Sequence, residues 1–241
     1  MSNQQQDDLK VHTNADMSHQ NSLLYKLSMF WDSIKLNGPI ETLERLLLRA
    51  YYRYKGIDFS TQNLHNLTLT GDYTDHGTAL VSSSRHFFKR ILAELEQFAG
   101  HQVSKKLFID YGSGKGAALI HARALGFERA IGIEFAKELN DVAIDNIRKL
   151  GLDHIDAYFR DATEYTPPKE TTVIYFFNPF DEVVMEKVMQ NISQQVYTTT
   201  PYIIYGRPTC GHVVEQYATK IGTSTHESGA VIDFYQLSKD H

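Results

Sequence analysis

The chain has 241 residues, of which 42% are hydrophobic and 22% are charged, and its formal net charge is −5. This composition is typical of a folded globular protein with one domain of ordinary size, and it excludes a fibrous or wholly disordered chain. The one cysteine cannot form an internal disulfide or a thiolate-rich zinc site. The negative net charge argues against a protein whose whole surface binds nucleic-acid phosphates.

Residues 1–20 are polar and lack the apolar core of a signal peptide, so we interpret them as a disordered tail and expect a cytoplasmic protein. No apolar run approaches the roughly 20 residues that cross a bilayer, so we expect no membrane partner.

Residues 21–84 are predicted to form a helical cap and a loop. Apolar residues recur at helical spacing over residues 22–55, with a break at Asn37-Gly38-Pro39, and turn-forming residues follow up to Ser84.

The second of these helices carries basic residues interleaved with tyrosines. Such a surface could bind RNA or an acidic protein by charge and stacking. A helix that packs through its apolar side and leaves its basic residues in water explains the same pattern. Nucleic acid is therefore a possible partner but not the favoured one. The residues concerned are Arg45, Arg49, Tyr51, Tyr52, Arg53, Tyr54 and Lys55.

Residues 85–241 are predicted to form an α/β domain. After a helix from Arg85 to about Gly100, five short apolar runs alternate with amphipathic helices, which is the pattern of a parallel sheet covered on both faces. Two last strands, joined by a short link, predict an antiparallel hairpin. The expected fold is thus a doubly wound, mostly parallel seven-stranded sheet that ends in this hairpin. The expected strands are 107–111, 130–134, 155–160, 173–177, 202–205, 223–227 and 231–237, and the helices between them are 117–125, 137–150 and 181–196.

A glycine-rich turn follows the first expected strand and contains Asp110, Gly112, Ser113, Gly114 and Gly116. Such a turn lets a ligand approach the backbone closely, and it also fits the loose fingerprint of dinucleotide sites. A pyrophosphate bound there would be repelled by the carboxylate of Asp110. S-adenosylmethionine, with a cationic ammonium and a cationic sulfonium, suits this acid better. A dehydrogenase that binds NAD stays an alternative.

Two more acidic positions follow the next two strands. Glu134 ends the second strand, where a carboxylate can accept hydrogen bonds from both hydroxyls of a ribose. Asp161 and Ala162 follow the third strand, where a short acid can accept a hydrogen bond from an adenine amine. Each acid alone could be a solvated strand end or a turn cap, but their order and spacing together favour an adenosyl ligand. Lys115 lacks the Ser/Thr neighbour of a P-loop, so we interpret it as a solvated residue.

Residues 106–178 resemble the class I, Rossmann-like S-adenosylmethionine-dependent methyltransferases. The resemblance rests on the Asp-x-Gly-x-Gly-x-Gly turn, the acid after the second strand and the Asp-Ala pair after the third. It implies S-adenosylmethionine as the cofactor, held by the turn and the acids described above, and we assign no metal site. It also implies that residues of an upstream loop cover the methionine part of the donor, with Tyr73 and Thr78 as candidates. His76, in the same loop, is either a general base or simply solvated.

The fourth strand ends in Asn178, Pro179 and Phe180, at the edge where ligands of open α/β sheets bind. These residues resemble the Asn-Pro-Pro-Tyr/Phe motif of methyltransferases that act on amino or amide nitrogens. The resemblance implies catalytic roles for all three, and a contact of Asn178 with the donor. The second proline of the motif is absent here, and an Asn-Pro turn that leaves a buried strand explains the same residues. The expected function is methyl transfer to a nitrogen of a protein or small molecule. An O-methyltransferase and a donor-binding regulatory protein without catalytic activity are the alternatives.

Overall fold

The computed structural model describes residues 23–60, 85–226 and 229–238. The chain divides into two compact units, with the boundary between Lys55 and Gly56. The predicted tail and most of the predicted loop lie outside the described residues. The domain boundary expected between residues 84 and 85 therefore stays a prediction.

The described part of the first unit is the helix α2, Leu23–Lys55. Gly38 interrupts it with the non-helical angles φ 79° and ψ 164°, and Pro39 follows, so two helical pieces meet at the predicted position. The hydroxyl of Thr42 donates a hydrogen bond of 2.8 Å to the carbonyl of Gly38. The second piece exposes basic side chains, and it also exposes the large apolar Leu43 and Leu47.

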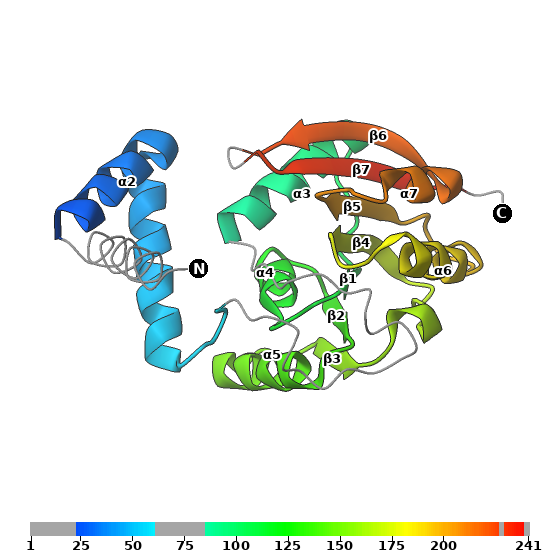
Figure 1. Ribbon diagram of the computed structural model, residues 1–241, viewed down its shortest axis with the longest axis horizontal. Coiled ribbons are helices and arrows are strands. Elements are labelled where there is room, and N and C mark those ends of the chain that lie inside the picture. Colours follow the sequence, from blue (N-terminus) through cyan, green and yellow to red (C-terminus); the bar gives the residue numbers. More distant parts are fainter. Residues whose placement is uncertain (1–22, 61–84, 227–228, 239–241) are drawn as a thin grey trace, which may run out of the picture. The chain divides into compact units, whose positions relative to one another are not determined.

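The second unit is built on a seven-stranded sheet with the order β3-β2-β1-β4-β5-β7-β6 (Figure 1). The first five strands are parallel, and β7 is antiparallel to both of its neighbours, β5 and β6. The predicted fold class is confirmed. The strands are β1 Leu107–Tyr111, β2 Arg129–Glu134, β3 Ile155–Phe159, β4 Thr171–Phe177, β5 Tyr202–Gly206, β6 Ala218–Thr225 and β7 Val231–Leu237.

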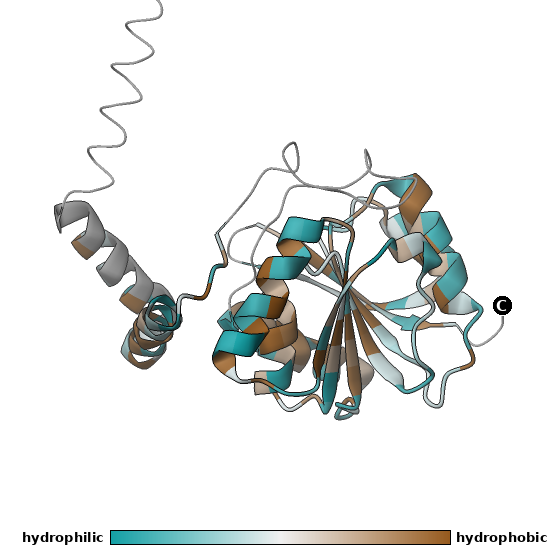
Figure 2. Ribbon diagram, turned by 90° about the horizontal axis from the view of Figure 1, so that it is seen from below, coloured by the Kyte–Doolittle hydropathy of each residue, from teal (hydrophilic) through white to brown (hydrophobic). Residues whose placement is uncertain are grey.

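Helices cover both faces of this sheet, and the apolar strands lie between them (Figure 2). Alternate residues of β1 enter two separate cores because successive side chains of a strand point to opposite faces. Ile109 belongs to a core with the buried side of α6, whereas Phe108 belongs to a core with α3 and α4. The helices are α3 Arg85–Ala99, α4 Ala117–Ala124, α5 Lys137–Leu150, α6 Glu182–Ser193 and α7 Gly211–Tyr217, with a short 3-10 helix η3, Ala162–Glu164.

The structure corrects several predicted bounds. Helix α7 was not expected, because a segment of seven residues is too short to show a helical period. Strand β6 begins at Ala218, five residues before the predicted start, because its first half is too polar to show a strand pattern; its predicted end at Glu227 lies outside the described residues. Helix α6 ends at Ser193, three residues before its predicted end, and β3 ends at Phe159, one residue before its predicted end.

None of the described helices has both the length and the apolar character needed to cross a bilayer.

Candidate functional site

The glycine-rich turn between β1 and α4, residues 110–116, is called the glycine turn below. Gly112 and Gly116 both have a φ of +80°, and Gly114 has a φ of +52°, a region that side chains disfavour. The backbone amide groups of Gly112 and Ser113 both donate to the carbonyl oxygen of Ile133 in β2, over 2.9 and 3.2 Å. The turn is therefore fastened to the carboxyl end of the neighbouring strand.

Glu134 lies beside this turn and is only 3% exposed. Its Oε2 accepts a hydrogen bond of 2.7 Å from the backbone amide of Gly114, and its Oε1 accepts one of 2.9 Å from that of Ala136. Burial raises the pKa of Glu134 to about 7, although these backbone hydrogen bonds act in the opposite direction. The carboxyl group therefore titrates near neutral pH.

Asp110 is the second buried acid at this edge and is 4% exposed. It lies on β1 in register with Gly132 of β2, two residues before Glu134. Burial raises the pKa of Asp110 well above its usual value, and the nearby charge of Glu134 raises it further. Burial thus disfavours the ionised forms of both carboxyl groups. A cationic ligand beside them would stabilise these ionised forms.

Asp161 follows β3 and is 8% exposed. Its Oδ1 accepts hydrogen bonds of 2.8 Å from both the backbone amide and the hydroxyl of Thr163, so it caps η3. The backbone amide of Arg160 donates to the carbonyl of Glu134 over 2.8 Å, which ties this segment to the second strand end. Ala162 is buried. The three predicted acids thus lie at the carboxyl ends of three adjacent strands.

Asn178 follows the end of β4 and has a φ of +46°. Its backbone amide donates to the carbonyl of Gly206 over 2.9 Å, and its Oδ1 accepts a hydrogen bond of 2.7 Å from the hydroxyl of Thr209. Thr209 has no recognisable pattern around it in the sequence, because it lies in the segment before the unpredicted helix α7. Phe180 is 6% exposed and packs in the core against Phe176.

Pro179 brings the segment after β4 into contact with the glycine turn. A Cβ atom placed on Gly112 would lie 2.7 Å from the Cβ atom of Pro179. The glycine turn and the Asn178-Pro179 segment are therefore in direct van der Waals contact, although 67 positions separate Gly112 from Pro179 in the sequence. Predicted residues from β1, β2 and β4 come together at one edge of the sheet.

Lys115 corrects the sequence-based interpretation, because its side chain is 2% exposed and is not solvated. Its Nζ donates to Oδ2 of Asp58 over 2.6 Å and to the hydroxyl oxygen of Ser60 over 3.0 Å. The partner carboxylate lies 57 positions earlier, so a local pattern cannot reveal it. With its donors directed to these oxygens, Lys115 does not have the arrangement of a phosphate-binding lysine.

Tyr73, His76 and Thr78 lie outside the described residues.

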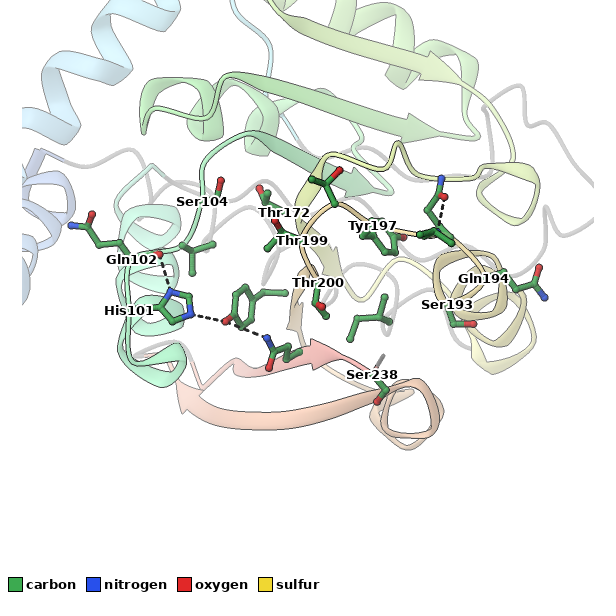
Figure 3. Close-up of a pocket in the computed structure, with 17 residues that line it drawn as sticks. His101, Gln102, Ser104, Thr172, Ser193, Gln194, Tyr197, Thr199, Thr200 and Ser238 are labelled. Atoms are coloured by element: carbon green, nitrogen blue, oxygen red, sulfur yellow. Dashed lines mark hydrogen bonds between the residues drawn. The ribbon is translucent and has the colours of Figure 1, made fainter. Parts of the chain in front are cut away.

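A cavity of about 760 Å³ opens at the opposite end of the strands from the candidate site, near the amino ends of β1, β4 and β5. It is lined by polar side chains including His101, Thr172 and Thr200 (Figure 3). It contains none of the predicted site residues. Among the described residues, no three His, Cys, Asp or Glu side chains gather in a group that could hold a metal ion.

No family model matches the chain. The uncharacterized protein MJ0284 of Methanocaldococcus jannaschii is 27% identical over 154 residues, which cover 57% of this chain and 67% of that protein. A SAM dependent methyltransferase from Aquifex aeolicus superposes with a TM-score of 0.51 at 13% identity, over 65% of this chain and 100% of the other. The PH0226 protein from Pyrococcus horikoshii also has a TM-score of 0.51, at 10% identity over 64% of this chain and 91% of the other.

The sheet order, the antiparallel β7 and the superposition on the Aquifex enzyme agree. The chain has the class I methyltransferase fold. The antiparallel strand β7, inserted between β5 and β6, also separates this fold from the dinucleotide-binding domain, whose mostly parallel sheet has the strand order 3-2-1-4-5-6. In open α/β sheets, ligands generally bind at the carboxyl ends of the strands, and in this sheet those ends carry Asp110, Glu134 and Asn178.

Proposed function

We propose that this chain is an S-adenosylmethionine-dependent methyltransferase. The observation that carries the proposal is the pair of buried acids, Asp110 and Glu134, on adjacent strand ends beside a left-handed glycine turn. Because burial raises the pKa of both, a cation at this edge would favour their charged forms. A pyrophosphate would have the opposite effect. The methyltransferase fold of the chain supports the same conclusion.

The residues fit an adenosyl ligand with distinct roles. Asp110 would face the cationic methionine end of the donor. The glycine turn would let the donor approach the backbone closely. Glu134 would accept hydrogen bonds from the ribose hydroxyls, because each of its oxygens has lone pairs beyond the one used by Gly114 or Ala136. Asp161 would accept a hydrogen bond from the adenine amine in the same way, and Ala162 would contact the ring.

The acceptor in this proposal is an amine or amide nitrogen. When bound, the donor supplies an electrophilic methyl group on its sulfonium. The carbonyl oxygen of the Asn178 side chain, already oriented by Thr209, would accept a hydrogen bond from the target nitrogen and direct its lone pair along the line of attack. The same oxygen would stabilise the positive charge that develops on the nitrogen. Pro179 keeps this group next to the glycine turn, and hence next to the donor.

Isothermal titration with S-adenosylhomocysteine tests the donor assignment. The wild type is expected to bind it, Asp110→Ala and Glu134→Ala to lose detectable binding, and Asn178→Ala to bind within about threefold of the wild type. Undiminished binding by Asp110→Ala would contradict the assignment of the cationic end. Binding of NADH without S-adenosylhomocysteine would indicate a dehydrogenase.

Tritiated S-adenosylmethionine, incubated with the protein and fractionated lysate, tests the acceptor. Label is expected in protein or small molecules on a nitrogen, identified by the acid and base stability of the product. Label on an oxygen would support the O-methyltransferase alternative, and label in RNA would indicate a nucleic-acid substrate. Donor binding with no labelled product in any fraction would favour a regulatory protein without catalytic activity.

A further inference from the structure

A buried lysine connects the glycine turn to the segment that begins the second unit. Lys115 is 2% exposed, and its Nζ lies 2.6 Å from Oδ2 of Asp58 and 3.0 Å from Oγ of Ser60. The other oxygen of Asp58, Oδ1, accepts from the backbone amide of Ser60 over 2.8 Å. A lysine is almost never fully buried unless it is paired, because its charge loses water. The pair with Asp58 therefore explains why Lys115 can be buried.

Asn146 of α5 fastens the same two segments a second time. This residue is 1% exposed, and its side chain makes three hydrogen bonds. Its Nδ2 donates to the carbonyl of Asp58 over 2.9 Å and to that of Lys115 over 3.1 Å, while its Oδ1 accepts from the amide of Asp58 over 3.0 Å. We call Asp58, Ser60, Lys115 and Asn146 the clamp. The clamp joins three segments that are distant in the sequence.

The clamp and Glu134 hold the glycine turn from two different directions. Glu134 binds the amide of Gly114, and Asn146 binds the carbonyl of the next residue, Lys115. The following residue, Gly116, packs on α5 so closely that a Cβ there would lie 3.1 Å from the Cβ of Ala143. Three consecutive residues of the turn are thus held in place before any ligand arrives, which lowers the cost of ordering them on binding.

The carboxylate of Asp58 in the clamp does not titrate near neutral pH. Partial burial acts to raise the pKa of Asp58, but hydrogen bonds from Lys115 and Ser60 outweigh it and lower this pKa to about 2. The carboxylate therefore stays charged at any pH that the folded protein meets in a cell.

We propose that Lys115, Asp58 and Asn146 are positioning residues of the donor site: they hold the glycine turn in its ligand-ready conformation and make that conformation depend on the attached segment Gly56–Ser60. This inference rests on the proposed function, because it treats the glycine turn as the donor site. It adds to that function a dependence of donor affinity on a segment outside the sheet. None of the three side chains needs to touch the donor.

The test is the affinity for S-adenosylhomocysteine, measured by titration on full-length protein at a temperature where circular dichroism shows every variant folded. Lys115→Met and Asp58→Asn are each expected to weaken binding at least tenfold. The double variant is expected to be no more than threefold weaker than the worse single variant, because both changes break one clamp. Lys115→Arg, which keeps a charged donor for Asp58, is expected to recover part of the affinity.

Lys220 provides a matched control, since its Nζ also has two oxygen partners, Glu215 Oε1 at 2.6 Å and Asp233 Oδ2 at 3.0 Å. It lies on β6, at the far edge of the sheet from β3. Lys220→Met is expected to bind S-adenosylhomocysteine within twofold of the wild type. If Asp58→Asn does not fold because it leaves the buried ammonium group of Lys115 without its counter-charge, Lys115→Met carries the test, since it leaves behind only a carboxylate that is 45% exposed.

The outcomes separate two failures. If the wild type binds and the folded clamp variants bind within twofold of it, the positioning role is wrong while the proposed function stands. A loss in Lys220→Met as large as in Lys115→Met would also overturn the role, since the effect would then be general destabilisation. If the wild type itself does not bind S-adenosylhomocysteine, the proposed function fails, and this inference fails with it.

Discussion

Gly112 and Pro179 touch across the site: a Cβ on Gly112 would approach the Cβ of Pro179 to 2.7 Å. This contact places the turn after β1 against the segment after β4, two neighbouring strands of the sheet. A donor bound at the turn and an acceptor bound at Asn178 would consequently lie next to each other.

Gly112→Ala is expected to destabilise the fold by about 2 kcal/mol or more, since it combines a left-handed backbone with a steric conflict. Affinity for S-adenosylhomocysteine is expected to fall at least tenfold as the turn and Pro179 move apart. Urea unfolding and titration measure the two effects. Gly151→Ala is the control: Gly151 has a φ of +63°, but a Cβ there meets nothing within 4 Å. If both variants bind equally well, the contact with Pro179 has no role in the site.

Donor binding is expected to release protons near neutral pH. Glu134 has a pKa of about 7 in the free protein, and hydroxyl donors of a ribose would favour its carboxylate. Titration at pH 6 in two buffers with different ionisation enthalpies should therefore show more protons released than titration at pH 8.5. Proton uptake, or release that does not change with pH, would contradict the assignment of Glu134.

The raised pKa of Glu134 also makes the stability of the fold depend on pH. Its folded pKa is raised from 4.5 to about 7, so between these values the folded state keeps a proton that the unfolded state has lost. The contribution of Glu134 to stability is therefore present below about pH 4.5 and decreases as the pH rises towards 7.

Thr209→Val is expected to slow methyl transfer about tenfold while the affinity for S-adenosylhomocysteine stays within twofold. Valine keeps the shape of threonine but cannot donate the 2.7 Å hydrogen bond that orients the Asn178 side chain. Initial rates with the identified acceptor measure the effect. Thr223→Val removes a hydroxyl with a hydrogen bond of the same length, to Asp233, and should leave the rate unchanged. Equal rates in both variants would show that Asn178 needs no orientation by Thr209.

The two partners of the ion pair in the clamp should differ in their effect on stability. Asp58→Asn leaves the ammonium group of Lys115 buried without a counter-charge, which is expected to cost on the order of 3 kcal/mol. Lys115→Met leaves behind a carboxylate that is already about half exposed, so the expected cost is less than half as large. Urea unfolding at pH 7 gives the comparison. A larger loss in Lys115→Met would mean that packing of the lysine stem outweighs its charge.

Local signals explain which parts of the fold could be predicted. Helix α5 has the predicted bounds, because a period of apolar residues ends at Gly151, which adopts the left-handed C-cap conformation. Asp181 caps α6 as expected, with its Oδ1 accepting from the amide of Val184. The strands of the parallel sheet were found because they are short, continuous apolar runs.

The parts that could not be predicted depend on contacts between distant residues. Lys115 resembles any exposed lysine until Asp58 is placed beside it, and Thr209 acquires its contact with Asn178 only through the fold. The acids of the candidate site were identified because each lies at or just past the carboxyl end of a strand, so the sheet alone brings them to one edge.

The position of β7 has a consequence for how the domain is made. Although it follows β6 in the sequence, it lies between β5 and β6 and not at the edge of the sheet. During synthesis, β6 therefore has no place to dock until residues 231–237 have emerged from the ribosome. Until then, the edge of β5 in the nascent chain has no strand paired with it. A shortened product that lacks β7 would expose this unpaired edge to other chains.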